Sequence, residues 1–120
     1  MLNVQTKYLI LNSRDELLRI ELSTLVCFEA DGNYTNILTK NKLKNTVSVN
    51  LSKMEELLTE YMGDMAPMFA RIGKGYIINL NYVHQVSVLK QRIVLSDGSN
   101  FAFQINTSKV AAKKLKQILL

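Results

Sequence analysis

The amino-acid sequence predicts a mainly β domain, built from small antiparallel sheets of short strands, with one internal helix and one C-terminal helix. Most apolar segments are short and are separated by polar turns, which is typical of antiparallel strands. Apolar residues recur at helical spacing in only two places. The length of 120 residues, with 48% hydrophobic and 21% charged residues, fits one globular core. We therefore expect a single domain over residues 1–120.

The first part of the chain is expected to form strands. Two of them, Lys7–Leu11 and Leu17–Glu21, flank the polar stretch Asn12–Glu16, and this pattern predicts a hairpin. The next three strands are expected at Leu25–Glu29, Tyr34–Thr39 and Leu43–Val49. The last two are separated by a short polar connection, so they should pair as a second hairpin.

The internal helix is expected at about residues 52–62. Ser52 and Glu55 form a capping-box pattern, in which the hydroxyl and the carboxylate each satisfy an unpaired amide of the first turn. The following apolar residues recur at helical spacing and predict one buried stripe, formed by Met54, Leu57, Leu58, Tyr61 and Met62. Gly63 is a natural stop, and Pro67 prevents the helix from continuing.

After this helix the pattern returns to strands. They are expected at Met68–Ile72, Tyr76–Leu80, Val83–Leu89, Arg92–Ser96 and Asn100–Ile105. Asp97-Gly98 is the strongest hairpin signal in the chain, because a type I′ turn needs positive φ at both central residues.

The C-terminal helix is expected at about residues 108–119, with Asn106 or Thr107 as its cap. Apolar residues at helical spacing predict that one side packs on the core. The outer side carries four lysines, which are Lys109, Lys113, Lys114 and Lys116.

The charge of the chain is divided unevenly. Residues 1–64 hold seven Lys or Arg and nine Asp or Glu, a net charge of −2. Residues 65–120 hold eight Lys or Arg and only Asp97 as an acid, a net charge of +7. A basic half of this kind suits a polyanion such as nucleic acid. The alternative is that the lysines only keep the protein in solution.

The sequence favours a cytoplasmic protein without enzymatic activity. No apolar run approaches the roughly 20 residues needed to span a bilayer, and the N-terminus lacks the pattern of a signal peptide. Cys27 is the only cysteine and His84 the only histidine, which excludes an internal disulfide and Cys-rich or His-rich metal sites. Apolar neighbours predict that Cys27 is buried, and His84 lies in a strand pattern. We expect no cofactor, no metal, no membrane contact and no small-molecule substrate.

Three polar loops interrupt the expected strands and carry side chains suited to nucleic acid. They are residues 31–36, residues 73–75 with the preceding Arg71, and residues 106–108. Asn, Lys, Arg, Tyr and Thr hydrogen-bond base edges and phosphates. Each loop also has a purely structural interpretation, as a turn, a connector or a helix cap.

The segments around these loops resemble the LytTR DNA-binding domain family. Residues 25–35, Leu-Val-Cys-Phe-Glu-Ala-Asp-Gly-Asn-Tyr-Thr, look like the family's opening motif, and residues 69–80, Phe-Ala-Arg-Ile-Gly-Lys-Gly-Tyr-Ile-Ile-Asn-Leu, look like its most recognisable stretch. Residues 93–98, Ile-Val-Leu-Ser-Asp-Gly, match a third motif. The resemblance covers about residues 20–120, with the three motifs in the family's order and spacing.

The resemblance implies a bacterial transcriptional regulator that binds specific double-stranded DNA. In this family loops enter successive major grooves and bend the duplex. The base-contacting positions of the family fall on Thr35, Lys74 and Asn106. The neighbouring candidates for DNA contact are Asn33, Tyr34 and Arg71. Phosphate contacts are expected from Lys109 and Lys113, with Lys40 or Lys42 as further choices. Because family members often occupy paired repeats, a homodimer on repeated sites is possible.

The sequence departs from the family pattern in the second loop. The family commonly has His and Ser where this chain has Gly73 and Gly75, and some members carry Arg at the position of Asn106. These departures leave an alternative function open, a protein-interaction or dimerisation module on the same fold with weakened DNA contact. Most members carry a receiver domain ahead of this one, and the residues before the resemblance are too few to form it.

Overall fold

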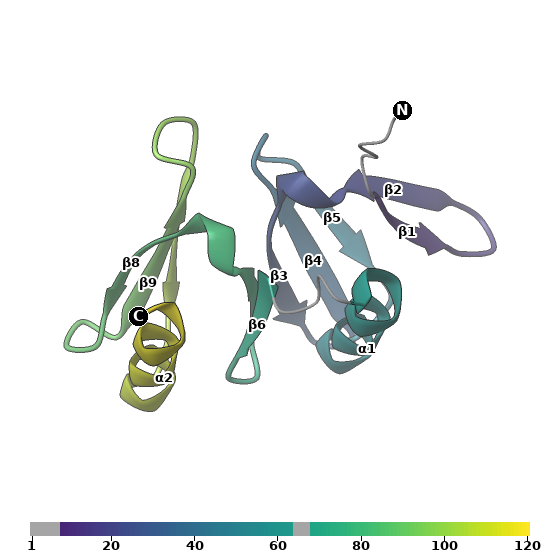
Figure 1. Ribbon diagram of the computed structural model, residues 1–120. Helices are drawn as coiled ribbons and strands as arrows, with labels where there is room; N and C mark the ends of the chain where they lie inside the picture. The colour runs from purple at the N-terminus through teal and green to yellow at the C-terminus, as the bar shows by residue number, and fades with distance from the viewer. Residues whose placement is uncertain (1–7, 64–67) are drawn as a thin grey trace.

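The computed structural model describes residues 8–63 and 68–120, and over these residues it confirms the mainly β architecture (Figure 1). The strands are β1 (Tyr8–Asn12), β2 (Leu17–Glu21), β3 (Leu25–Asp31), β4 (Tyr34–Thr39), β5 (Lys44–Val47), β6 (Phe69–Ile72), β7 (Tyr76–Asn79), β8 (Val83–Ser87), β9 (Arg92–Ser96) and β10 (Ala102–Asn106). The helices are α1 (Leu51–Met62) and α2 (Lys109–Leu119), with short 3₁₀ turns η1 (Leu22–Thr24) and η3 (Leu80–Tyr82).

The strands form three antiparallel sheets. β1 and β2 make a separate hairpin, and a five-stranded sheet has the order β5-β4-β3-β7-β6. A three-stranded sheet has the order β10-β9-β8. Figure 1 shows α1 and the β1–β2 hairpin on one side of the five-stranded sheet, and the three-stranded sheet with α2 on the other.

The central strands of the five-stranded sheet are buried on both faces. Phe28 and Ile77 belong to a core that includes α1 and the β1–β2 hairpin, whereas their neighbours Cys27 and Ile78 belong to a second core with β9, β10 and α2. All four side chains are at most 2% exposed. Because side chains alternate along a strand, the central strands β3 and β7 contribute to both cores at once.

Both helices form where the periodicity predicts them, but each is capped by a residue other than the expected one. Asn50, not Ser52, caps α1, because its side-chain oxygen accepts from the backbone N–H of Lys53 at 2.8 Å. Ser108, not Asn106 or Thr107, caps α2 by accepting from Ala111 N–H at 3.1 Å. The helix stop at Gly63 is confirmed by its positive φ of 49°. Pro67 lies outside the described residues.

The hairpin between β9 and β10 is confirmed, but its turn is longer than the predicted two-residue type. Five residues connect Ser96 to Ala102, and only Gly98 among them has positive φ (91°). One carboxylate oxygen of Asp97 accepts from the backbone N–H groups of Ser99 and Asn100 at 3.0 and 2.7 Å. These bonds lower the pKa of Asp97 to about 2, and the bond from Ser99 makes the largest contribution. The side chain therefore organises this turn.

The single cysteine and the single histidine lie in different environments. Cys27 is 1% exposed, and its burial, with a smaller contribution from the charge of Glu29, raises its pKa to about 12. His84 is exposed on β8. Within the described residues, no group of three or more His, Cys, Asp or Glu side chains could hold a metal ion. Neither helix of the described chain is both long and apolar enough to cross a membrane.

Candidate nucleic-acid interface

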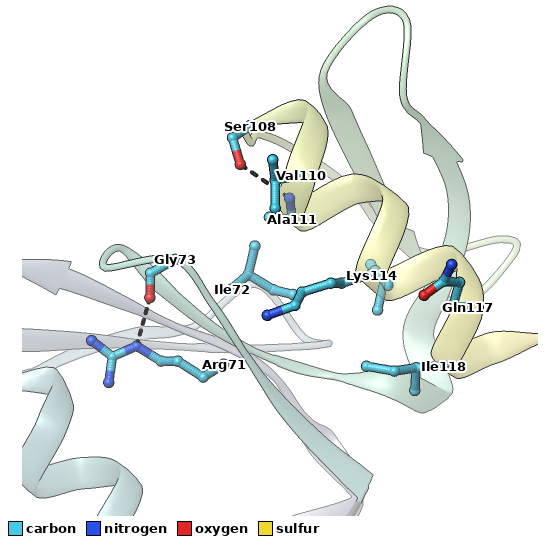
Figure 2. Close-up of a pocket in the computed structure, with 10 residues that line it drawn as sticks. Arg71, Ile72, Gly73, Ser108, Val110, Ala111, Lys114, Gln117 and Ile118 are labelled. Carbon is cyan, nitrogen blue, oxygen red and sulfur yellow. Dashed lines mark hydrogen bonds between the residues drawn. The ribbon is translucent and has the colours of Figure 1, made fainter.

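The three polar loops lie beside one another. We call residues 31–36, around the β3–β4 turn, the first loop, the β6–β7 turn at residues 73–75 the second, and residues 106–108 the third. The second loop is bonded to the strand end that precedes the first, because Ala30 N–H donates to Gly75 O at 2.8 Å. Gly73 of the second loop and Ser108 of the third line opposite walls of a groove of about 670 Å³ that lies between β6 and α2 (Figure 2). The loops therefore follow one edge of the molecule.

In the first loop, the residues at the tip are the ones that face solvent. Asp31 and Tyr34 are paired across the hairpin, and Gly32, with φ of 61°, allows the tight turn between them. Asn33 is exposed, and the Tyr34 side chain is 50% exposed. Both can therefore reach a ligand without any rearrangement of the hairpin.

Thr35, the expected base-contacting residue of this loop, is instead buried. Its side chain is 0% exposed, and its hydroxyl donates to Val49 O at 2.6 Å. A base contact would require this hydroxyl to exchange its partner and the side chain to leave the core. The base contact of Thr35 stays a prediction, and the geometry favours Asn33 and Tyr34 as the contacting residues of the first loop.

A polar network that the sequence did not reveal holds the strands below the first two loops. The Asn36 amide, 3% exposed, donates to the Glu29 carboxylate at 3.1 Å and accepts from the Thr46 hydroxyl at 2.6 Å. The other Glu29 oxygen accepts from Tyr76 OH at 3.4 Å. Burial and the nearby Glu29 carboxylate raise the pKa of Tyr76. The network therefore connects β5, β4, β3 and β7, whose ends carry the first and second loops.

In the second loop, Lys74 is exposed at the tip and Arg71 holds the loop from below. Arg71 Nε donates to Gly73 O at 2.9 Å, and one of its terminal nitrogens donates to Lys74 O at a longer 3.5 Å (Figure 2 shows the first bond). Its other terminal nitrogen pairs with Glu55 Oε1 of α1 at 2.9 Å. Arg71 is thus only partly free to contact DNA, whereas Lys74 is fully available.

The third loop brings further basic residues to the same edge. Asn106 is exposed and lies opposite Arg92 in the β9–β10 register. Thr107 N–H donates to Gln91 O at 2.9 Å, which places the β8–β9 turn and its exposed Lys90 beside this loop. Neither Lys90 nor Arg92 was expected at the site. The sequence feature that could have identified them is their position on either side of Gln91 in a predicted turn between two strands.

The lysines of α2 point in two directions. Lys109 and Lys113 are exposed and lie about 40° apart around the helix, at roughly 100° per residue. Lys114 lies a further 100° around, and Figure 2 shows its side chain extending across the groove toward the second loop. Lys40 and Lys42 follow the far end of β4 and therefore lie away from the three loops.

The amino-acid sequence also matches a known family. Residues 15–120 match the family model of the LytTr DNA-binding domain, which extends slightly further toward the N-terminus than the resemblance described above. The chain belongs to the LytTR family. LytTR domains are known as DNA-binding domains, so DNA is the partner that family membership implies.

A solved LytTR structure supports the fold. The LytTr DNA-binding domain of a protein described as a methyl-accepting/DNA response regulator from Bacillus cereus is similar with a TM-score of 0.65 and 19% sequence identity. The similarity covers 97% of this chain and 98% of that one. None of the curated proteins matches the chain significantly.

Proposed function

We propose that this LytTR domain is a bacterial, cytoplasmic transcriptional regulator that binds specific double-stranded DNA sequences through its three loops. The observation that carries the proposal is the position of these loops along one edge, with Asn33, Lys74 and Asn106 exposed at their tips. Amide and ammonium side chains of this kind form hydrogen bonds with base edges in the major groove.

The exposed side chains suggest a division of roles. Lys74, Asn106 and, in the first loop, Asn33 and Tyr34 lie at loop tips, so we assign them to base contacts. Three lysines of α2 and the lysine of the β8–β9 turn flank the loops, so we assign them to phosphates, which position a protein without reading sequence. These lysines are Lys90, Lys109, Lys113 and Lys114.

The charge distribution supports a strong electrostatic contribution to binding. Residues 65–120, which carry the second and third loops and α2, have a net charge of +7. If five phosphates are neutralised, the logarithm of the affinity should fall with the logarithm of the salt concentration at a slope of roughly −4 to −5. A partner protein held by a mixed polar surface would show a much weaker dependence.

A homodimer on repeated DNA sites is a further part of the proposal. α2 leaves Val110 and Ile118 exposed, at 69% and 60%. Apolar side chains at this level of exposure are available for contact with a neighbouring copy when two domains occupy adjacent repeats.

The test is selection of ligands from a random double-stranded DNA pool at about 150 mM salt, followed by sequencing. Recovery of a short motif, alone or as two repeats about one helical turn apart, supports the proposal. Lys74→Ala should relax the motif at one position, whereas the matched control Lys40→Ala, at the far end of β4, should leave the motif unchanged. A pool that stays random, with binding only at low salt, would contradict the proposal and favour the interaction module.

A further inference from the structure

The second loop has a shape that its own sequence does not impose. Gly73 and Gly75 flank Lys74, and glycine has the largest conformational freedom to lose when a chain is ordered. The space around both glycines is open, since an added Cβ would meet no atom within 4 Å. Neither the two glycines nor steric contacts around them therefore fix the direction in which Lys74 points.

The direction of Lys74 is fixed instead by hydrogen bonds to three consecutive carbonyl groups. Arg71 donates to Gly73 O and Lys74 O, and Ala30 N–H donates to Gly75 O. The first two carbonyls belong to the peptide planes on either side of the Lys74 Cα. When both planes are held, the direction of the Lys74 Cα–Cβ bond is held as well.

Glu55 fixes the guanidinium that makes these bonds. Its carboxylate accepts from Arg71 Nη1 at 2.9 Å, and it lies on α1, a helix anchored in the core by Met54 and Leu58. The Arg71 side chain is 25% exposed and that of Glu55 51% exposed. The ion pair thus connects a rigid helix to the tip of the second loop.

We propose that the Arg71–Glu55 pair is a positioning device, which orients Lys74 for base contact, and that Arg71 acts through the loop and not by contacting DNA itself. The inference rests on the proposed DNA-binding function. Lysine cannot replace Arg71 in this role, because one ammonium group lacks the planar set of donors that reaches two carbonyls and a carboxylate together.

The direction in which Glu55→Gln changes specific DNA affinity distinguishes this inference from direct DNA contact by Arg71. If Arg71 positions the loop, Glu55→Gln should lower the ratio of specific to random-sequence DNA affinity about threefold, and Arg71→Lys about tenfold, with the salt slope unchanged. If Arg71 contacts DNA, releasing it from Glu55 should instead raise the specific affinity. Arg71→Gln would then reduce the salt slope by about one.

Glu56→Gln is the matched control. It removes the same charge from the next position of α1, is exposed, and makes no ion pair within the described residues. Its specificity ratio should equal that of the wild type. An unchanged ratio for Glu55→Gln, or a rise in its specific affinity beyond that of Glu56→Gln, would overturn the inference.

A second measurement keeps the inference separate from the proposed function. In the protein without DNA, exchange of the Ala30 amide, which donates to Gly75 O, should accelerate in Glu55→Gln and Arg71→Lys but not in Glu56→Gln. If the wild type binds no specific DNA, the proposed function fails. The hydrogen-exchange measurement then still decides whether the Arg71–Glu55 pair orders the second loop. Equal exchange in all variants would refute it.

Discussion

The burial of Thr35 gives a sharp prediction for the substitution Thr35→Val. Valine keeps the shape of the side chain and removes the hydroxyl that donates to Val49 O at 2.6 Å. If the structure describes the working conformation, this change should reduce stability and leave DNA binding unaltered. If Thr35 contacts a base, as the family resemblance implies, DNA binding should fall as well.

The size of the stability change follows from the environment of the hydroxyl. Thr35 is 0% exposed, so the carbonyl of Val49 loses its side-chain donor in a site that solvent does not readily reach. The loss of one such bond costs about 1–2 kcal/mol. For a domain of this size, a change of 1 kcal/mol shifts the Tm by roughly 3–6 °C. We therefore expect a Tm lowered by about 5 °C.

The assay combines thermal unfolding followed by circular dichroism with DNA titration at 20 °C, where the variant is still folded. Asn33→Ala is the matched control and should show the opposite pattern, with an unchanged Tm and weaker binding, because Asn33 is exposed at the tip of the same loop. A tenfold loss of specific affinity in folded Thr35→Val would refute the assignment of Thr35 to the core.

Three further predictions concern charged side chains. Lys74→Ala should relax the base preference at one position of the DNA motif and weaken specific binding by about 1–3 kcal/mol, as measured by titration against single-base variants of the selected site. Lys113→Ala should weaken binding to all sequences equally and reduce the salt slope by about one; an unaltered slope would mean that this face of α2 points away from DNA. Asp97→Ala should lower the Tm at neutral pH, because the carboxylate that bonds the turn is lost. The pKa of Asp97 is depressed in the folded state to about 2, so its stabilisation is present above the ordinary value of 3.8 and is lost as the pH falls toward 2. The Tm difference between wild type and Asp97→Ala should therefore shrink over this range, and a constant difference would contradict the role of the charge.

The pattern of apolar residues predicted the elements well because periodicity depends on burial, and burial dominates the choice between strand and helix. Leu17–Glu21, Tyr34–Thr39 and Arg92–Ser96 were predicted with the bounds observed. Both helices were placed within one residue at each end. These segments have an apolar face that packs in the fold. The predicted stripes were too wide, however, because Tyr61 of α1 and Val110 and Ile118 of α2 are more than half exposed.

Details that depend on competition between neighbouring polar residues were predicted less well. Asn50 and Ser52 are both good helix caps, and only the three-dimensional path into α1 decides between them. In the β9–β10 turn, Asp97 bonds three successive amides of a longer loop, an interaction that the Asp-Gly pair alone does not reveal.

The candidate site illustrates the same limit. The sequence identified the three loops, but not which of their side chains face outward. Thr35 and Tyr34 are adjacent in a strand, so one of them must point inward, and the long-range contact with Val49 selects Thr35. The bond between Arg71 and Glu55, sixteen residues apart in the chain, is likewise a long-range contact that the sequence alone does not reveal.

The burial of β3 and β7 on both faces has an evolutionary consequence. Their side chains are committed to two cores, so substitutions there are felt throughout the fold. The loop tips carried by the same strands are open, and at Gly75, where φ is not positive, an added Cβ would meet no atom within 4 Å. Selection can therefore change the loop tips, and with them the DNA preference proposed above, while the two buried strands keep the spacing between the tips constant.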